Sequence, residues 1–167
     1  MTRWLGIDLG EKRVGLALAD GDVTEAIARP FMTLRRGRDI ASDVASLTAI
    51  IERERIDELV VGLPLDASGD EGPQATLTRA WGEAVAVQVG LPVGFRDERL
   101  TSHIAEARLG PMKRGRSGGP PTRTQRDTYR ARVDREAAAI ILQDELDTRS
   151  GRRSSTPRSP DPQESDT

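Results

Sequence analysis

Residues 4–19 read WLGIDLGEKRVGLALA, and their pattern indicates how the fold begins. Two short apolar runs, at residues 4–9 and 13–19, flank the polar segment Gly10-Glu11-Lys12. Apolar runs of this length on either side of a glycine-containing turn are typical of a β-hairpin. A third extended stretch, at residues 25–34, is expected to continue the hairpin into an antiparallel meander.

The remainder of the chain alternates between helical and extended patterns. Apolar residues recur at helical spacing in residues 39–55, and residues 59–63 form the continuous apolar run of a strand buried on both faces. In the helix expected at residues 73–89, Leu77 and Trp81 are predicted to face the core. The predicted order is helix 39–55, strand 58–65, helix 73–89, strand 93–99, short helix 102–109 and last helix 132–147. This order predicts an α/β fold, in which a mixed five-stranded sheet starts with an antiparallel meander and has flanking helices.

The composition of the 167-residue chain restricts its chemistry. The absence of cysteine excludes thiolate metal sites and cysteine catalysis, and a single histidine, His103, excludes sites with several histidine ligands. His103 itself is expected to be an ordinary, partly exposed residue. Carboxylates, Arg, Ser, Thr and backbone amides remain, and they favour hard-metal or phosphate chemistry.

A formal net charge of −2 conceals an uneven charge distribution. Residues 108–132 hold eight cations and one anion, so the rest of the domain is strongly acidic. Frequent glycine and proline in the basic segment predict a flexible basic loop at about residues 110–131. The Ser- and Pro-rich residues 148–167 predict a disordered tail, which leaves residues 1–147 as the folded domain.

The chain contains no apolar run of the roughly 20 residues that a membrane span requires. Asp8 interrupts the first apolar run too early for a signal-peptide core. A soluble, cytoplasmic protein without membrane contact is therefore expected.

Acidic residues occupy three places where carboxylates are unusual. Asp8 interrupts the first strand, Asp134 lies on the inward face of the last helix, and the pair Asp97-Glu98 follows a strand at its carboxyl end. Side chains alternate along a strand, so only one of Asp97 and Glu98 can join Asp8. Each place also has a structural explanation: a turn cap for Asp8, a helix-dipole contact for Asp134 and a surface acid for the pair.

Acids brought together in this way require a counter-charge. Two carboxylates about 4 Å apart repel by roughly 4 kcal/mol at an effective dielectric near 20. Oxygen ligands select Mg²⁺, Mn²⁺ or Ca²⁺, and two ions roughly 3.5–4 Å apart clamp the attacking and leaving oxygens of a phosphodiester. We therefore expect one or two Mg²⁺ or Mn²⁺ ions as cofactors of a nuclease, with Lys113 and Arg114 of the basic loop as phosphate contacts.

Five motifs, in this order along the chain, resemble the YqgF/RuvX family. They are residues 6–15 (GIDLGEKRVG), 60–65 (VVGLPL), 72–75 (GPQA), 97–102 (DERLTS), and Val133-Asp134 with Ala137-Ala138. The resemblance covers about residues 3–147 and rests on the combination of all five motifs. It implies a ribonuclease H-like fold related to the RuvC Holliday-junction resolvases. It also implies a metal-dependent nuclease that processes the 5′ end of pre-16S rRNA in ribosome biogenesis.

The motifs also imply roles for individual residues. By resemblance, Asp8, Glu98 and Asp134 are the catalytic acids and metal ligands, and Lys12 and Arg13 lie near the nucleic acid. Metal-activated water is expected to attack the phosphodiester. By analogy with the fold, the products are expected to carry a 5′-phosphate and a 3′-hydroxyl. The expected partners are pre-16S rRNA, carried by a ribosomal subunit precursor, or branched DNA.

Three other functions remain open at this point. Holliday-junction cleavage differs only in substrate and normally needs a two-fold dimer, and nothing in the sequence decides between a monomer and a homodimer. A non-catalytic RNA-binding assembly or transcription factor could use the same fold, although it would gain nothing from buried acids that face phosphate. An actin-like ATPase or sugar kinase shares the Gly-Ile-Asp-Leu-Gly hairpin, but it needs a second such hairpin that the sequence lacks.

Overall fold

The computed structural model describes residues 1–115 and 117–151, which form a five-stranded mixed sheet in the order β3-β2-β1-β4-β5. The expected meander is confirmed: β1 (Thr2–Leu9), β2 (Arg13–Gly21) and β3 (Arg29–Arg35) are each antiparallel to the next. β4 (Glu58–Leu63) pairs parallel to β1, and β5 (Val93–Asp97) pairs parallel to β4. The carboxyl ends of β1, β4 and β5 therefore meet at one edge of the sheet.

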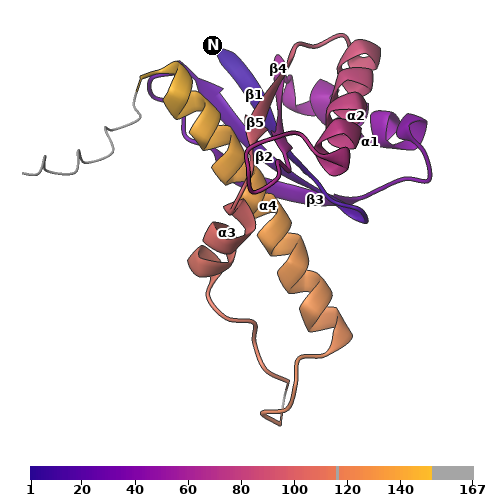
Figure 1. Ribbon diagram of the computed structural model, residues 1–167, viewed down its shortest axis with the longest axis vertical. Coiled ribbons are helices and arrows are strands. Elements are labelled where there is room, and N and C mark those ends of the chain that lie inside the picture. Colours follow the sequence, from indigo (N-terminus) through magenta and orange to yellow (C-terminus); the bar gives the residue numbers. More distant parts are fainter. Residues whose placement is uncertain (116, 152–167) are drawn as a thin grey trace, which may run out of the picture.

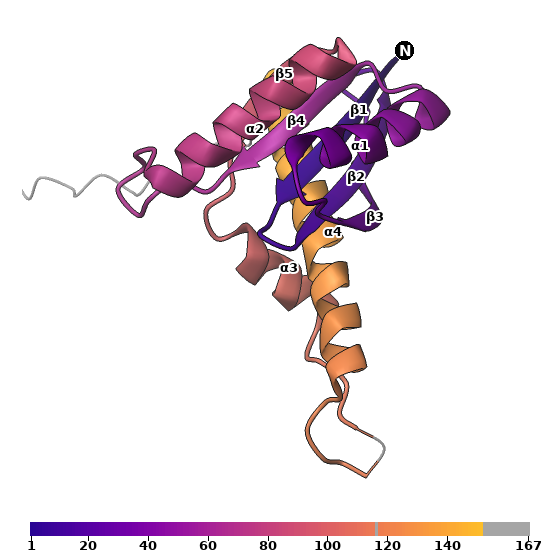
Figure 2. The same ribbon diagram turned by 90° about the vertical axis from the view of Figure 1, so that its right-hand side faces the viewer.

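Helices cover both faces of this sheet (Figure 1, Figure 2). α1 (Ile40–Glu54) and α2 (Pro73–Val89) lie on one face, and the long α4 (Arg123–Arg149) crosses the other. α3 (Thr101–Leu109) packs beside α4, whose N-terminal half projects beyond the sheet together with the loop that joins the two helices. None of the helices in the described part of the chain has the length and apolar character to cross a membrane.

Alternation along the strands divides the core between the two faces. Leu5 and Ile7 of β1 are fully buried in the cluster that includes α1 and α2, whereas Trp4 and Val60 belong to the cluster under α4. Successive side chains of a strand point to opposite faces, so Asp8 shares the face of Trp4. The backbone pattern of β1 therefore directs the Asp8 carboxylate toward α4.

The basic loop is shorter than the sequence pattern predicts. α4 begins at Arg123 because Thr122 and Gln125 form a capping box, in which the Gln125 N–H donates to Thr122 Oγ1 at 3.2 Å and the Thr122 N–H donates to Gln125 Oε1 at 2.8 Å. The prediction of a flexible loop at about residues 110–131 is therefore wrong for residues 123–131, which are helical. The predicted disordered tail starts at residue 148, and this start is wrong because Thr148 and Arg149 form the end of α4. Residues 152–167 of the tail lie outside the described residues.

The face of α2 that meets the sheet also differs from the prediction. Leu77 is 65 % exposed, whereas Thr78, Trp81 and Val85 are buried. These three positions recur at helical spacing and form the inward face, which places the neighbouring Leu77 outside it. Trp4 and Trp81 are both buried, so their prediction as core residues is confirmed.

Candidate active site

The carboxyl groups of Asp8 and Glu98 meet at the edge where the parallel strands end. Asp8 is the penultimate residue of β1, and Glu98 directly follows β5. The backbone N–H of Glu98 donates to the carbonyl oxygen of Leu63 at 3.1 Å, which ties it to the end of β4. The Asp8 and Glu98 side chains are hydrogen-bonded to one another. Of the two acids left open by the sequence, Glu98 is the one that lies beside Asp8.

Asp97 takes no part in this contact. Its carboxylate accepts hydrogen bonds from the backbone N–H and from Nε of Arg99, at 2.9 and 2.8 Å. Desolvation raises the pKa of Asp97, but the hydrogen bonds from Arg99 outweigh it and hold the pKa below its usual value. Asp97 is therefore an ionised surface acid in an ion pair with Arg99.

Gly62 of β4 makes room for the side chain of Glu98. A Cβ at position 62 would lie 2.5 Å from Glu98 Oε2 and 2.6 Å from Ile141 Cδ1. In the sequence, Gly62 belongs to an apolar run and to the motif at residues 60–65, and neither assigns it a role of its own. The contact between Asp8 and Glu98 thus depends on a glycine whose role sequence reasoning missed.

Burial keeps a proton on the acidic pair. Burial raises the pKa of Asp8 to about 6, and the charge of Asp134 adds to this, while the hydrogen bond with Glu98 opposes it. Burial and the charge of Asp8 raise the pKa of Glu98 to about 9. At neutral pH Glu98 is therefore protonated and donates its proton to the Asp8 carboxylate. A hard cation could replace that proton, since it would supply the positive charge that the two oxygen ligands lack.

Asp134 lies near the pair but is held by a different partner. Its Oδ2 accepts a hydrogen bond from Arg13 Nε at 2.6 Å, and both side chains are partly buried. Within residues 1–115 and 117–151, no three His, Cys, Asp or Glu side chains form a group that could hold a metal ion. The structure thus assembles Asp8 and Glu98 and leaves Asp134 beside them, bound to Arg13. His103 is exposed on α3.

A close backbone contact sets the position of Asp134. A Cβ at Gly15 of β2 would lie 2.1 Å from the backbone oxygen of Asp134, so only glycine fits there. α4 therefore touches β2 directly at this residue. The resulting register between helix and strand places the Asp134 carboxylate next to Arg13, two residues before Gly15.

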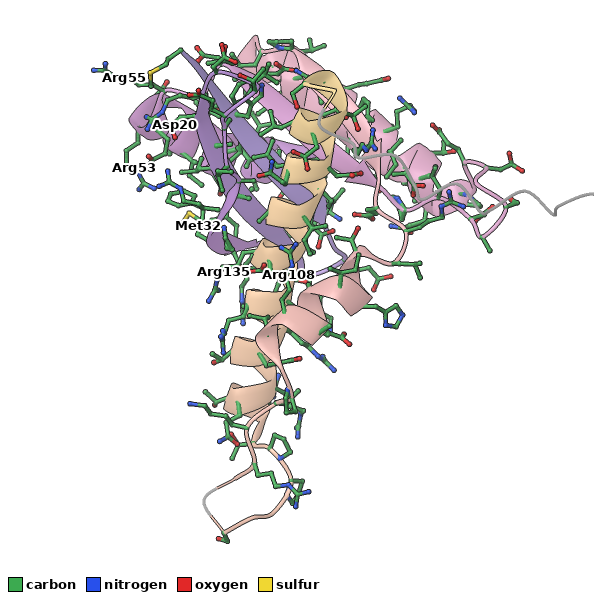
Figure 3. The ribbon with its side chains drawn as sticks, turned by 90° about the vertical axis from the view of Figure 1, so that its left-hand side faces the viewer. Asp20, Met32, Arg53, Arg55, Arg108 and Arg135 are labelled. Carbon is green, nitrogen blue, oxygen red and sulfur yellow. The ribbon has the colours of Figure 1, made fainter. Side chains whose placement is uncertain are left out.

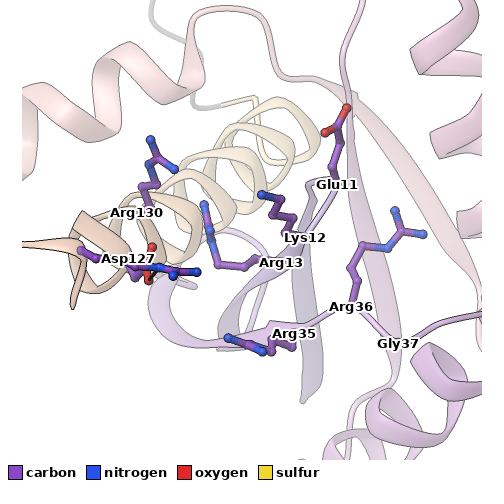
Figure 4. Close-up of a pocket in the computed structure, with 9 residues that line it drawn as sticks. Glu11, Lys12, Arg13, Arg35, Arg36, Gly37, Asp127 and Arg130 are labelled. Atoms are coloured by element: carbon purple, nitrogen blue, oxygen red, sulfur yellow. Dashed lines mark ion pairs between the residues drawn. The ribbon is translucent and has the colours of Figure 1, made fainter. Parts of the chain in front are cut away.

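The four residues expected to contact substrate are divided between different surfaces. Lys12 and Arg13 line a cavity of about 510 Å³ (Figure 4). Lys113 lines a second cavity of about 280 Å³ beside Tyr129. Arg114 lies in the loop, where its carbonyl oxygen accepts a hydrogen bond from the Gln125 side chain at 3.2 Å. Neither Lys113 nor Arg114 lines the cavity that Lys12 and Arg13 share.

The strand order β3-β2-β1-β4-β5, with helices on both faces of the sheet, is that of a protein with the ribonuclease H-like fold. The structure resembles RuvC of Thermus thermophilus in complex with a Holliday junction substrate, with a TM-score of 0.51 and 15 % sequence identity. The match covers 90 % of this chain and 97 % of that chain. The predicted fold is therefore confirmed.

Sequence comparison gives the family within this class. The RuvX family, described as Holliday junction resolvase, matches residues 2–148. A relative from Anaeromyxobacter sp. (strain Fw109-5) is 45 % identical over 147 residues, and one from Anaeromyxobacter dehalogenans (strain 2CP-C) is 41 % identical. Each match covers 88 % of this chain and 98 % of the relative, and both relatives are named "Putative pre-16S rRNA nuclease". The chain belongs to the RuvX family.

Proposed function

We propose that this chain is a divalent-metal-dependent nuclease that processes the 5′ end of precursor 16S rRNA in ribosome biogenesis. Its family and the names of its relatives support nuclease activity on RNA. The observation that carries the proposal is the contact between the partly buried carboxyl groups of Asp8 and Glu98 at the carboxyl ends of β1 and β5. A partly buried, mutually repelling pair of acids is costly for folding, and its position at the strand ends is typical of a ligand site.

The residues present fit Mg²⁺ or Mn²⁺. Asp8 and Glu98 would hold the ion through carboxylate oxygens, and Asp134 would join them when its carboxylate leaves Arg13. When bound, one or two such ions would stabilise the negative charge that develops on the phosphoryl oxygens during hydrolysis. Nearby acidic groups keep Glu98 protonated when no metal is bound. A bound cation would neutralise the negative charge of the same groups.

Arg13 and Lys12 orient the substrate in this proposal. Arg13 is partly buried and anchored through Nε to Asp134, which leaves its terminal N–H groups available to a phosphate oxygen. Lys12 is exposed at the hairpin turn, next to Arg13. Together they would place a phosphodiester over the acidic pair, and their charge would offset the repulsion between the phosphate and the acids.

A cleavage assay tests this function. The substrate is labelled RNA that carries the 5′ extension of precursor 16S rRNA, incubated with Mg²⁺, with Mn²⁺ or with EDTA. We expect trimming with either metal and none with EDTA.

Asp8→Asn keeps the side-chain shape but removes the ligand charge, so it should reduce trimming to background. Asp97→Asn is the matched control, because Asp97 lies next to Glu98 in the chain but is paired with Arg99. Cleavage by Asp8→Asn at the wild-type rate would contradict the assignment.

Holliday-junction cleavage is the second candidate, and the description of the family favours it. A labelled four-way DNA junction in the same assay separates the two substrates. Preferential cutting of the junction by a dimeric protein would make the junction the substrate. Binding of RNA without cleavage under every metal condition would instead favour a non-catalytic assembly factor.

A further inference from the structure

The basic cavity beside the acids extends beyond Lys12 and Arg13. Three segments line it: the β1–β2 turn, the end of β3 and the N-terminal half of α4 (Figure 4). Six of its nine lining residues are cations and two are acids. The cations are Lys12, Arg13, Arg35, Arg36, Arg123 and Arg130, and the acids are Glu11 and Asp127.

The cations of this cavity differ in whether an acid neutralises them. Arg13, Arg36 and Arg123 form ion pairs with Asp134, Asp43 and Asp127, at 2.6, 3.4 and 4.0 Å. Within the part of the chain that the structure describes, no carboxylate lies within 4.0 Å of Lys12, Arg35 or Arg130. All three side chains belong to exposed residues, so their positive charges are available to a ligand.

The pairing of β2 with β3 places two of the cations opposite one another. Arg13 and Arg35 are direct partners in the antiparallel register. Like charges in directly opposed positions destabilise a sheet, because their side chains share one face at short distance. An anion bound between the two guanidinium groups would convert this repulsion into attraction. The register therefore favours a role for Arg35 in binding an anion.

A buried carboxylate fixes the rim of the cavity after Arg35. Asp43, only 4 % exposed, accepts hydrogen bonds from the backbone N–H of Gly37 at 2.7 Å and from Trp81 Nε1 at 3.1 Å. It also pairs with Arg36, which donates to the carbonyl oxygen of Gly10 at 3.3 Å. This network joins the end of β3 to the β1–β2 turn, so the cavity wall is already formed in the free protein.

One face of α4 continues the cavity toward the candidate active site. Four charged residues lie on this face at helical spacing: Arg123, Asp127, Arg130 and Asp134. The helix extends about 16 Å from Arg123 to Asp134. Arg13 and Arg130 also line the smaller cavity, of about 180 Å³, that contains Asp134. Cavity-lining residues, in which cations outnumber acids, thus continue from Asp134 to the N-terminal end of α4.

We propose that this basic cavity binds the sugar-phosphate backbone of the substrate on one side of the scissile phosphate. The inference rests on the proposed function for the position of the scissile bond. Lys12, Arg35 and Arg130 would contact phosphate oxygens and no base edges, so binding would not depend on sequence. Nucleotides and polyphosphates carry similar anionic oxygens and therefore serve as competitors in the test.

The test compares RNA binding by the wild type and by the double variant Arg35→Gln/Arg130→Gln. Labelled single-stranded RNA is titrated in EDTA, which prevents cleavage, over a range of salt concentrations, and binding is followed by fluorescence anisotropy. At low salt we expect the double variant to bind at least about tenfold more weakly, since each charge-assisted hydrogen bond contributes roughly a factor of ten or more. The slope of log K against log salt should become shallower by about 0.7 for each phosphate that the variant no longer neutralises.

A variant that is expected to bind RNA more tightly and a matched control complete the experiment. Asp127→Asn removes a negative charge from the cavity, so it should bind RNA more tightly than the wild type, a change that a folding defect would not produce. Arg53→Gln/Arg55→Gln removes the same charge as the double variant. Both residues are exposed at the end of α1, about 22 Å along the helix from its start near Gly37 (Figure 3). We expect this control to bind RNA as the wild type does.

The outcomes separate this inference from the proposed function. Wild-type RNA affinity in Arg35→Gln/Arg130→Gln would overturn the inference, even if Asp8→Asn loses cleavage. Weak binding by the double variant would support the cavity even if the wild type cuts no RNA. If ATP or inorganic pyrophosphate binds tightly, with the same dependence on Arg35 and Arg130, and RNA binding does not depend on them, the cavity is a nucleotide or polyphosphate site and the inference is wrong.

Discussion

Asp8 and Glu98 reach one another from strands that are not neighbours, because β4 lies between β1 and β5. Ile7 pairs with Val61 in the parallel register, which places Asp8 level with Gly62. Since Gly62 has no side chain, the carboxyl group of Glu98 can cross β4 to Asp8. At the residue scale, the site therefore depends on a missing side chain as much as on the two acids.

The raised pKa values of the acidic pair predict how stability depends on pH without metal. The folded protein keeps protons that the unfolded chain releases, so the stabilisation from the protonated pair is complete below about pH 4. It is lost as the pH rises through the folded pKa values of about 6 and about 9. Glu98→Gln retains a neutral donor to Asp8, so it should melt at a higher temperature than the wild type at pH 8. We expect a gain of about 2–4 °C for each kcal/mol.

Thermal unfolding in EDTA at pH 5 and pH 8 measures this effect. The difference between Glu98→Gln and the wild type should be larger at pH 8. Asp97→Asn is the control, and it should show no such gain because its ion pair with Arg99 favours the charged form. Equal melting temperatures for Glu98→Gln and the wild type at pH 8 would contradict the shared proton.

At the element scale, α4 has two distinct halves. Its C-terminal half packs Ile141, Leu142 and Leu146 against the sheet. Its N-terminal half projects past the sheet, starts at the Thr122 capping box and contacts α3 through Val133. Asp134 lies between the halves, where the helix touches β2 at Gly15. The same helix thus carries a candidate metal ligand, Asp134, and forms one wall of the basic cavity.

Gly15→Ala tests the contact between β2 and α4. The added Cβ would meet the backbone oxygen of Asp134, which cannot rotate away as a side chain can. We expect a loss of about 1–3 kcal/mol in the free energy of unfolding, the usual cost of overpacking, together with lower nuclease activity because Asp134 must shift. Urea denaturation measures the first effect and the RNA cleavage assay the second.

Gly119→Ala is the control for this variant, because no described atom lies within 4 Å of a Cβ at that position. Its unfolding midpoint should equal that of the wild type. An unchanged midpoint for Gly15→Ala would show that helix and strand can separate without cost.

At the scale of the whole molecule, charge is segregated along the long axis. The sheet and its two helical layers belong to an acidic body, and most of the basic segment lies on the projecting part of α4 and its loop (Figure 1). The acids of the candidate site lie close to the junction of these two parts. Substrate phosphates would be attracted to the projection, and metal ions to the acids, so the two ligands would not compete for one surface.

Metal binding should stabilise the entire domain. An ion that binds only the folded state adds about 2.7 kcal/mol when its concentration is 100-fold above its Kd. Mg²⁺ or Mn²⁺ should therefore raise the melting temperature of the wild type relative to EDTA. The increase should disappear in Asp8→Asn and persist in Asp97→Asn. An equal increase in all three proteins would place the metal elsewhere.

Much of the fold could be predicted from the sequence because the patterns that indicate each element involve residues close together in the chain. The turn at Gly10, the helical spacing in α1 and the apolar run of β4 each report local backbone preference and burial. The position of Asp8 in an apolar strand likewise marks it as unusual. The Thr122 capping box is equally local, and neglecting it produces the wrong start for α4.

The side chains that share a site are brought together by long-range packing. The contact of Glu98 with Asp8 across Gly62, the ion pair of Arg13 with Asp134 and the pairing of Arg35 with Arg13 join residues from separate segments. Strand alternation shows that Asp97 and Glu98 point to opposite faces, but not which face α4 covers. That choice follows from the order of strands and from the register of α4 against β2, and both are set by packing across the whole sheet.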